Sequence, residues 1–173
     1  VRSSAASDVY KRQVQQNPDN QIVTDYVWHE LAFGLENLGM PAQVMRRRVA
    51  EIAHFFGIES WFRQKTDTLS GGQKQLLNLA SVMALQPEVL ILDEPTAVLT
   101  PQETEKLFRV LRKMRDDGKA IIIITHKMHE VESLSDRVAV LRDGRYIGSM
   151  ATKDTTVTEM TNMMVGHAVT LNI

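Results

Sequence analysis

The chain has 173 residues, which is enough for one domain with a real core, and 43% of them are hydrophobic. A formal net charge of −1 gives no electrostatic reason to expect nucleic acid as a partner, and the lack of cysteine excludes disulfides and thiolate metal sites. The longest purely apolar run, Ala120 to Ile124, is far too short to span a bilayer. Any membrane association must therefore come through a partner.

The beginning of the chain is polar. Residues 1–13 are small and polar with no clear period, which predicts a disordered or non-native leader before a folded part over residues 14–173. Residues 14–21 contain Pro18 among polar side chains and predict a loop. On this evidence alone, Gln16 in that loop is an ordinary surface glutamine.

Two helices are predicted between residues 25 and 57. Asp25 is expected to cap the first, Gly39-Met40-Pro41 ends it, and Gly57 ends the second. The basic run Arg46-Arg47-Arg48 lies on a helix that also carries acids, which is typical of a solvated face and not of a nucleic-acid patch. Apolar residues recur at helical spacing, at Val27, Leu31 and Leu35 in the first helix and at Met45, Val49, Ile52, Ala53 and Phe56 in the second.

The most informative stretch is Leu69 to Pro95. It opens with Ser70, Gly71, Gly72 and Gln73, which lead into an apolar-periodic segment that predicts a helix. Backbone N–H groups at a glycine-freed helix N-terminus carry partial positive charge and point outward. Such an end suits phosphate oxygens.

A buried strand is predicted at Val89 to Leu92, where the run is continuously apolar. Asp93 and Glu94 follow it directly, and Pro95 stops it. Open α/β sheets bind ligands at the carboxyl ends of their strands. One carboxylate placed there can orient Mg²⁺ and the other can activate a water molecule.

The rest of the chain predicts two helices, one strand and a β-hairpin. Thr100, Pro101 and Glu103 supply the N-cap, the first position and the capping box of a helix that ends at Gly118. Ile121 to Ile124 predicts a second buried parallel strand, which delivers His126 to its carboxyl end. Residues 136–148 predict a β-hairpin over an Asp-Gly turn, and residues 159–165 predict a last short helix.

Together and in this order, these segments resemble the signature and Walker B motifs of ATP-binding cassette (ABC) ATPases. The resemblance implies an α/β fold, with a P-loop-type parallel sheet core that lacks its N-terminal strands, and with a C-terminal β-hairpin. It also implies a helical subdomain over residues 18–68, and signature, Walker B, D-loop and H-loop regions within residues 69–173. Thr100 stands where many members carry an aspartate in the D-loop.

The resemblance also assigns roles to individual residues. It implies that Asp93 orients Mg²⁺ and that Glu94 is the general base for the attacking water. His126 would be the H-loop histidine, and Gln16 the Q-loop glutamine that ligates Mg²⁺ or holds the water. The signature residues that would contact ATP held by a partner subunit are Ser70, Gly71, Gly72 and Gln73.

Different parts of the chain resemble different branches of this family. Residues 14–62 are most similar to energy-coupling-factor and cobalt-type ATPases, and residues 95–171 to nucleoside and simple-sugar importer ATPases. A chimeric or misassembled fragment is one hypothesis, and a genuine intermediate branch is the other.

The sequence lacks the family's phosphate-binding P-loop, G-x-x-x-x-G-K-S/T, since alanine follows its only Gly-Lys pair, Gly118-Lys119. Because that loop lies upstream of the Q-loop in the family, we expect the C-terminal two-thirds of a nucleotide-binding domain, inactive alone.

The resemblance implies ATP and Mg²⁺ as cofactors, a second ATPase subunit (identical or not) and transmembrane permease subunits at the cytoplasmic face of the membrane. Two alternatives stay open: a non-catalytic interaction fragment and a non-transport ABC ATPase. The absence of sustained heptads disfavours the second of these.

Overall fold

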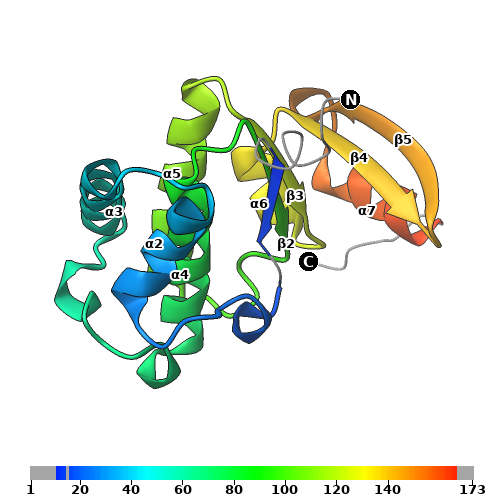
Figure 1. The fold of residues 1–173 in the computed structure, drawn as a ribbon. Helices are drawn as coiled ribbons and strands as arrows, with labels where there is room; N and C mark the ends of the chain where they lie inside the picture. Colours follow the sequence, from blue (N-terminus) through cyan, green and yellow to red (C-terminus); the bar gives the residue numbers. More distant parts are fainter. Residues whose placement is uncertain (1–10, 15, 167–173) are drawn as a thin grey trace. The chain divides into compact units, whose positions relative to one another are not determined.

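A parallel sheet organises the first part of the chain and an antiparallel hairpin the last part (Figure 1). This arrangement is seen in a computed structural model that describes residues 11–14 and 16–166. The two sheets belong to separate units, Val1–Ile124 and Thr125–Ile173. The predicted helical subdomain falls inside the first unit and stays a prediction.

The parallel sheet has the strand order β1-β2-β3, formed by Lys11–Val14, Val89–Asp93 and Ala120–Ile124. Every pairing is parallel, with Val14 opposite Leu92 and Asp93 opposite Ile124. The α/β prediction is confirmed, and so is the prediction that the apolar runs before Asp93 and His126 form neighbouring parallel strands. Their carboxyl ends therefore meet at the same edge of the sheet. The prediction that the second of these strands is buried is wrong, because no residue of β3 is buried and its Ile122 and Ile124 are exposed.

The first strand shortens the predicted leader of residues 1–13. Lys11, Arg12 and Gln13 belong to β1 and pair with β2 through the backbone, so their assignment to the leader is wrong. Polar residues give no alternating or apolar β pattern, so the strand was not predicted. It forms because pairing with a buried neighbouring strand can override a weak local pattern. Residues 1–10 lie outside the described part of the chain.

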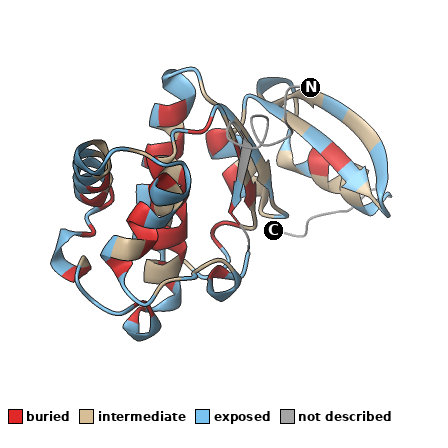
Figure 2. Cartoon of the chain, viewed as in Figure 1, coloured by how far each residue is buried: buried red, intermediate tan, exposed pale blue. Residues whose placement is uncertain are grey.

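Helices of the first unit pack around α4. Both α2 and α3 contact α4, which also contacts β1, while α5 contacts β3. Figure 1 shows α4 and α5 on the same side of the sheet, and Figure 2 shows buried residues concentrated along α4. The helices are α2 (Val27–Asn37), α3 (Ala42–Phe56), α4 (Gly71–Ala84) and α5 (Pro101–Asp116), with 3-10 turns η1 (Pro18–Asn20), η2 (Glu59–Trp61) and η3 (Thr66–Thr68).

Two helix ends follow the predicted signals. Gly57 ends α3 with a left-handed φ of 67°, a conformation that glycine adopts without a steric penalty. Thr100 caps α5 in a complete capping box with Glu103, and Pro101 takes the first helical position. Side chains within three residues of each other therefore define the start of α5.

The predicted cap of α2 is wrong. Tyr26, not Asp25, occupies the N-cap position, and its side chain makes no capping hydrogen bond. Instead, the amides of Val27 and Trp28 donate to the carbonyls of Gln64 and Phe62, both at 3.1 Å. A distant segment thus satisfies the first amides of the helix, so no side-chain cap is needed.

The second unit contains α6 (Met128–Leu134), β4 (Arg137–Arg142), β5 (Arg145–Ala151), η4 (Thr152–Asp154) and α7 (Val157–Val165). The hairpin prediction is confirmed, with φ values of 51° at Asp143 and 72° at Gly144 in the turn.

The last helix begins two residues earlier than predicted, because Thr156 caps it and Glu159 is its third residue. Within the described range, no helix is long and apolar enough to cross a membrane.

Candidate nucleotide-hydrolysis site

The carboxyl end of β2 has an unusual backbone. Asp93 is the last residue of the strand, and the amide of Glu94 donates to the carbonyl of Ile124 at 2.9 Å. Glu94 has a φ of 45°, which side-chain-bearing residues seldom adopt. Such strain persists only where surrounding structure enforces it, and it gathers at functional sites. Here both backbone polar groups of Glu94 are engaged, since its carbonyl also accepts from the amide of Ala97 at 3.1 Å.

The predicted Mg²⁺ ligands approach the same sheet edge from two strands. Gln16 follows the end of β1 by two residues and is exposed, and Asp93 comes directly after Leu92, the partner of Val14. An amide oxygen and a carboxylate are the hard oxygen donors that Mg²⁺ prefers. In the described part of the chain, no group of three or more histidine, cysteine, aspartate or glutamate residues could hold a metal. One amide and one carboxylate fit a nucleotide-borne Mg²⁺, which takes its other ligands from water and phosphate.

The predicted phosphate-binding helix end is well formed. Ser70 is the N-cap of α4, and its Oγ accepts from the amide of Gln73 at 3.2 Å. The Gln73 side chain returns the bond, with Oε1 accepting from the Ser70 amide at 2.9 Å. The capping box engages both side chains, and the main-chain amides of Gly71 and Gly72 belong to the first turn, whose N–H groups have no partner within the helix itself.

The two signature glycines have different surroundings. A Cβ on Gly71 would lie 3.8 Å from the Cβ of Val98, an ordinary contact. A Cβ on Gly72 would come within 2.6 Å of Oε1 of Glu103, the capping-box residue of α5. Gly72 therefore lets the start of α5 approach the start of α4 closely.

His126 lies just after β3, in the first residues of the second unit. Its side chain is exposed, and the turn around it is held by the Lys127 amide, which donates to Thr125 Oγ1 at 3.1 Å. The strand delivers the histidine as predicted. Its role at the γ-phosphate stays a prediction.

Residues 3–97 match the profile of the ABC transporter family, which is more than half of the chain. The chain belongs to the ABC transporter family. The match begins within the predicted leader and ends just after the Asp93-Glu94 pair.

Two relatives and a solved structure extend this result. The chain is 44% identical over 135 residues (78% of its length) to the energy-coupling factor transporter ATP-binding protein EcfA1 of Ligilactobacillus salivarius, covering 48% of that protein. It is 41% identical over 140 residues (81% of its length) to the glucose import ATP-binding protein TsgD13 of Haloferax volcanii, covering 25% of that protein. Both importer types that the sequence resembles are thus among its relatives.

The structure of cbiO1 from Clostridium perfringens, part of the ABC transporter complex cbiONQ, matches with a TM-score of 0.80 at 34% identity. The match covers 91% of this chain and 63% of that one. The chain thus has the cbiO1 fold over most of its length, while it spans between about a quarter and a half of the length of the curated relatives it matches.

Three features of this ABC chain escaped the sequence analysis: β1, the contact between Gly72 and Glu103, and the polar face of α4 that carries Lys74 and Asn78. The sequence did contain an indication of the polar face of α4. Asn78 interrupts an otherwise apolar run of α4, and an amide at a buried helix position must find a hydrogen-bond partner.

Proposed function

We propose that this chain carries the metal-binding and water-activating side of the ATPase site of an ABC importer. One observation carries the proposal: Gln16 and the pair Asp93-Glu94 follow adjacent parallel strands at one sheet edge, where Glu94 has a φ of 45°. That edge is where open α/β sheets bind ligands.

Each residue has a distinct part in the proposed chemistry. Asp93 and Gln16 offer oxygen ligands to the Mg²⁺ that accompanies ATP, and bound Mg²⁺ would neutralise charge on the transferred phosphoryl group. Glu94 accepts a proton from the attacking water. His126 hydrogen-bonds the γ-phosphate.

The N-terminal end of α4 acts on a second nucleotide. The amides of Gly71 and Gly72 lie at the positive end of the α4 helix dipole. This end suits the γ-phosphate of an ATP molecule held by a partner ATPase subunit, with Ser70 and Gln73 holding the turn in shape. Two such subunits would therefore complete each other's sites.

The permease contact is proposed to lie on the helical part of the first unit. Tyr26, Trp28 and Phe33 are large apolar residues exposed at the start of α2 and along it, and exposed apolar groups of this kind mark interaction surfaces. The partners are transmembrane permease subunits, which place the chain at the cytoplasmic face of the membrane and select the substrate.

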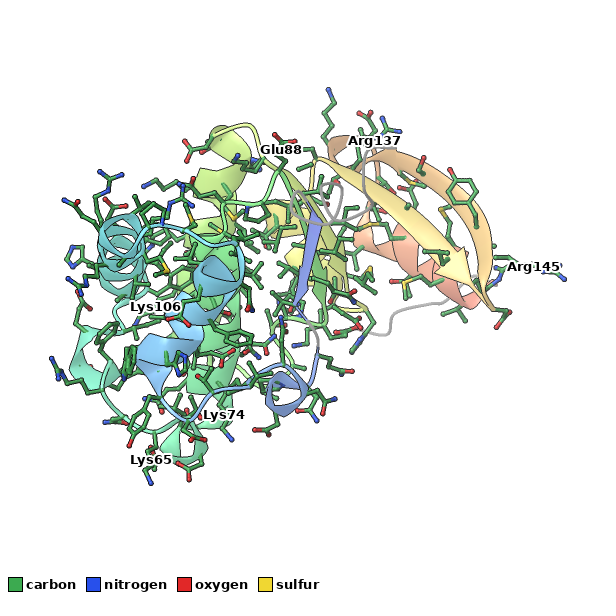
Figure 3. All side chains as sticks on the ribbon, viewed as in Figure 1. Lys65, Lys74, Glu88, Lys106, Arg137 and Arg145 are labelled. Carbon is green, nitrogen blue, oxygen red and sulfur yellow. The ribbon has the colours of Figure 1, made fainter. Side chains whose placement is uncertain are left out.

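The test is the substitution Glu94→Gln in a domain completed with a segment that carries a P-loop. We expect Mg²⁺-dependent ATPase activity to fall about a hundredfold or more, with ATP binding retained, because glutamine keeps the size of the side chain and loses the base. Glu88→Gln is the matched control, since Glu88 precedes the other end of β2 (Figure 3) and should leave the rate unchanged. Near-normal turnover of the Glu94→Gln variant would refute the assignment of the base.

A non-catalytic interaction module is the second candidate. Ile122 and Ile124 leave one face of the sheet exposed, which favours a chain that must be covered by another polypeptide. The same assay separates the two: an interaction module would bind the P-loop-bearing segment, and Glu94→Gln would not affect any activity of the assembly.

A further inference from the structure

Two side chains of α4 hold the turn that follows Gln16. The Asn78 amide group, through Nδ2, donates to the carbonyl of Pro18 at 2.9 Å. The Lys74 ammonium group donates to Oδ1 of Asp19 at 2.6 Å. Lys74 and Asn78 are four residues apart and so share one helix face. Both contacts end on η1, which begins two residues after Gln16.

These contacts differ from incidental surface pairs. Asn78 is fully buried, at 0% exposure, and a buried amide is costly unless it is hydrogen-bonded. The Lys74 side chain is only 18% exposed, although that of Asp19 is 64% exposed. An ion pair this open adds little stability by itself. Together with the Asn78 bond, its main effect is to fix where η1 lies.

The turn also has hydrogen bonds of its own. Asn17 caps η1 by accepting from the Asp19 amide at 3.1 Å, and the Gln21 amide closes the turn by donating to the carbonyl of Pro18 at 3.2 Å. Gln16 and Pro18 are two residues apart, a span of about 7 Å at most. The two contacts of α4 therefore fix the chain within three residues of Gln16.

We propose that Lys74 and Asn78 are positioning residues for Gln16. They join the signature end of α4, at Ser70, to the loop that carries the Mg²⁺ ligand. This inference rests on the proposed function, because it assumes the roles given there to Gln16 and to the signature residues.

Hydrogen exchange of the full chain tests the physical link without requiring activity. Asn78→Leu removes the amide donor at similar size, and we expect exchange of the Asn20 and Gln21 amides to accelerate about tenfold. Lys74→Met keeps an apolar stem and should give a smaller increase in a chain that stays folded. Lys106→Met is the control, since Lys106 is an exposed residue of α5 (Figure 3). Unchanged exchange of Asn20 and Gln21 in both variants of α4 would overturn the proposal.

The Mg²⁺ dependence of the completed ATPase tests positioning against a merely structural role. Asn78→Leu and Lys74→Met should raise the Mg²⁺ concentration for half-maximal activity several-fold, with little change in the KM for ATP at saturating Mg²⁺. The double variant Asp19→Lys with Lys74→Asp keeps the ion pair with its charges exchanged. Its Mg²⁺ requirement should therefore be closer to that of the unsubstituted chain than the requirement of Lys74→Met is. Faster exchange with an unchanged Mg²⁺ requirement would refute the positioning role. A wild-type assembly without ATPase activity would instead refute the proposed function.

Discussion

The two faces of the parallel sheet are covered very differently. Leu90 and Leu92 have no exposed surface on the face that packs against helices, where Leu92 shares its surroundings with Leu76 of α4 and Leu107 of α5. On the opposite face, Ile122 and Ile124 are each 51% exposed. We call these the covered face and the open face.

The two faces contribute differently to stability and to the predicted site. Apolar burial stabilises a fold roughly in proportion to area, so the covered face supplies most of the sheet's contribution to stability. The Asp93 side chain shares the open face with Ile124, its partner in the register. The carboxylate predicted to hold Mg²⁺ therefore lies on the open face.

Leu92→Ala on the covered face should have the largest effect. We expect the free energy of unfolding to fall by about 3 kcal/mol, because the substitution leaves a cavity in a close-packed region. Ile124→Ala on the open face is the matched control and should cost less than about 1 kcal/mol, since half of that side chain already meets water. Urea denaturation of both variants measures the difference. Equal losses would contradict the distinction between the two faces.

Gly72→Ala should lower the free energy of unfolding by an intermediate amount. It tests whether the helices on the covered face are as closely packed at their starts as they are against the sheet. The new methyl group would press on the Glu103 carboxylate and disturb the capping box of α5, for a net loss of about 1–2 kcal/mol. Gly71→Ala, which has room for its Cβ, should be neutral or slightly stabilising. Thermal denaturation of the pair checks this. If Gly71→Ala proved the more harmful, the packing assigned to the signature turn would be incorrect.

The smallest effect is expected in the second unit, outside the sheet comparison. The backbone N–H of Thr156 is the main reason why the pKa of Glu159 is held below its ordinary 4.5. A lowered carboxyl pKa gives stability that is present above the unfolded-state pKa and is lost as the pH falls through the folded-state pKa.

Glu159→Gln should therefore lower the melting temperature of the second unit slightly at pH 7. Its deficit relative to the unsubstituted chain should disappear in acid, below pH 4.5. Melting followed by circular dichroism at several pH values provides the measurement. A deficit that persisted undiminished in acid would show that the Glu159 charge is not responsible.

The features that sequence reasoning predicted correctly depend on near neighbours. The capping box of Thr100 with Glu103 and the Asp143-Gly144 turn each involve residues within three positions, so local patterns are sufficient. The apolar strands before Asp93 and His126 were also predictable as parallel strands from their continuous apolar runs. The predicted burial of the second was wrong, since Ile122 and Ile124 are each 51% exposed.

The features that it missed depend on distant partners. Polar β1 exists because Lys11 and its neighbours pair with Val89 and the residues after it, and α2 lacks a side-chain cap because Gln64 satisfies Val27. The hold of Asn78 on Pro18 spans 60 residues. A local pattern can show that a residue such as Asn78 needs a partner, but it cannot identify that partner. The two residues of each pair come together only when the chain has folded.

The central claim is that this sheet edge activates water and binds Mg²⁺ but needs another segment to grip the phosphates. Calorimetric titration of the purified chain with MgATP, with phosphate release followed in parallel, tests it most directly. Asp93 and Glu94 repel the nucleotide's own charge, so we predict no measurable binding or turnover for the chain alone. Both should appear when a P-loop-bearing segment is supplied. Micromolar affinity with turnover in the chain alone would contradict the claim.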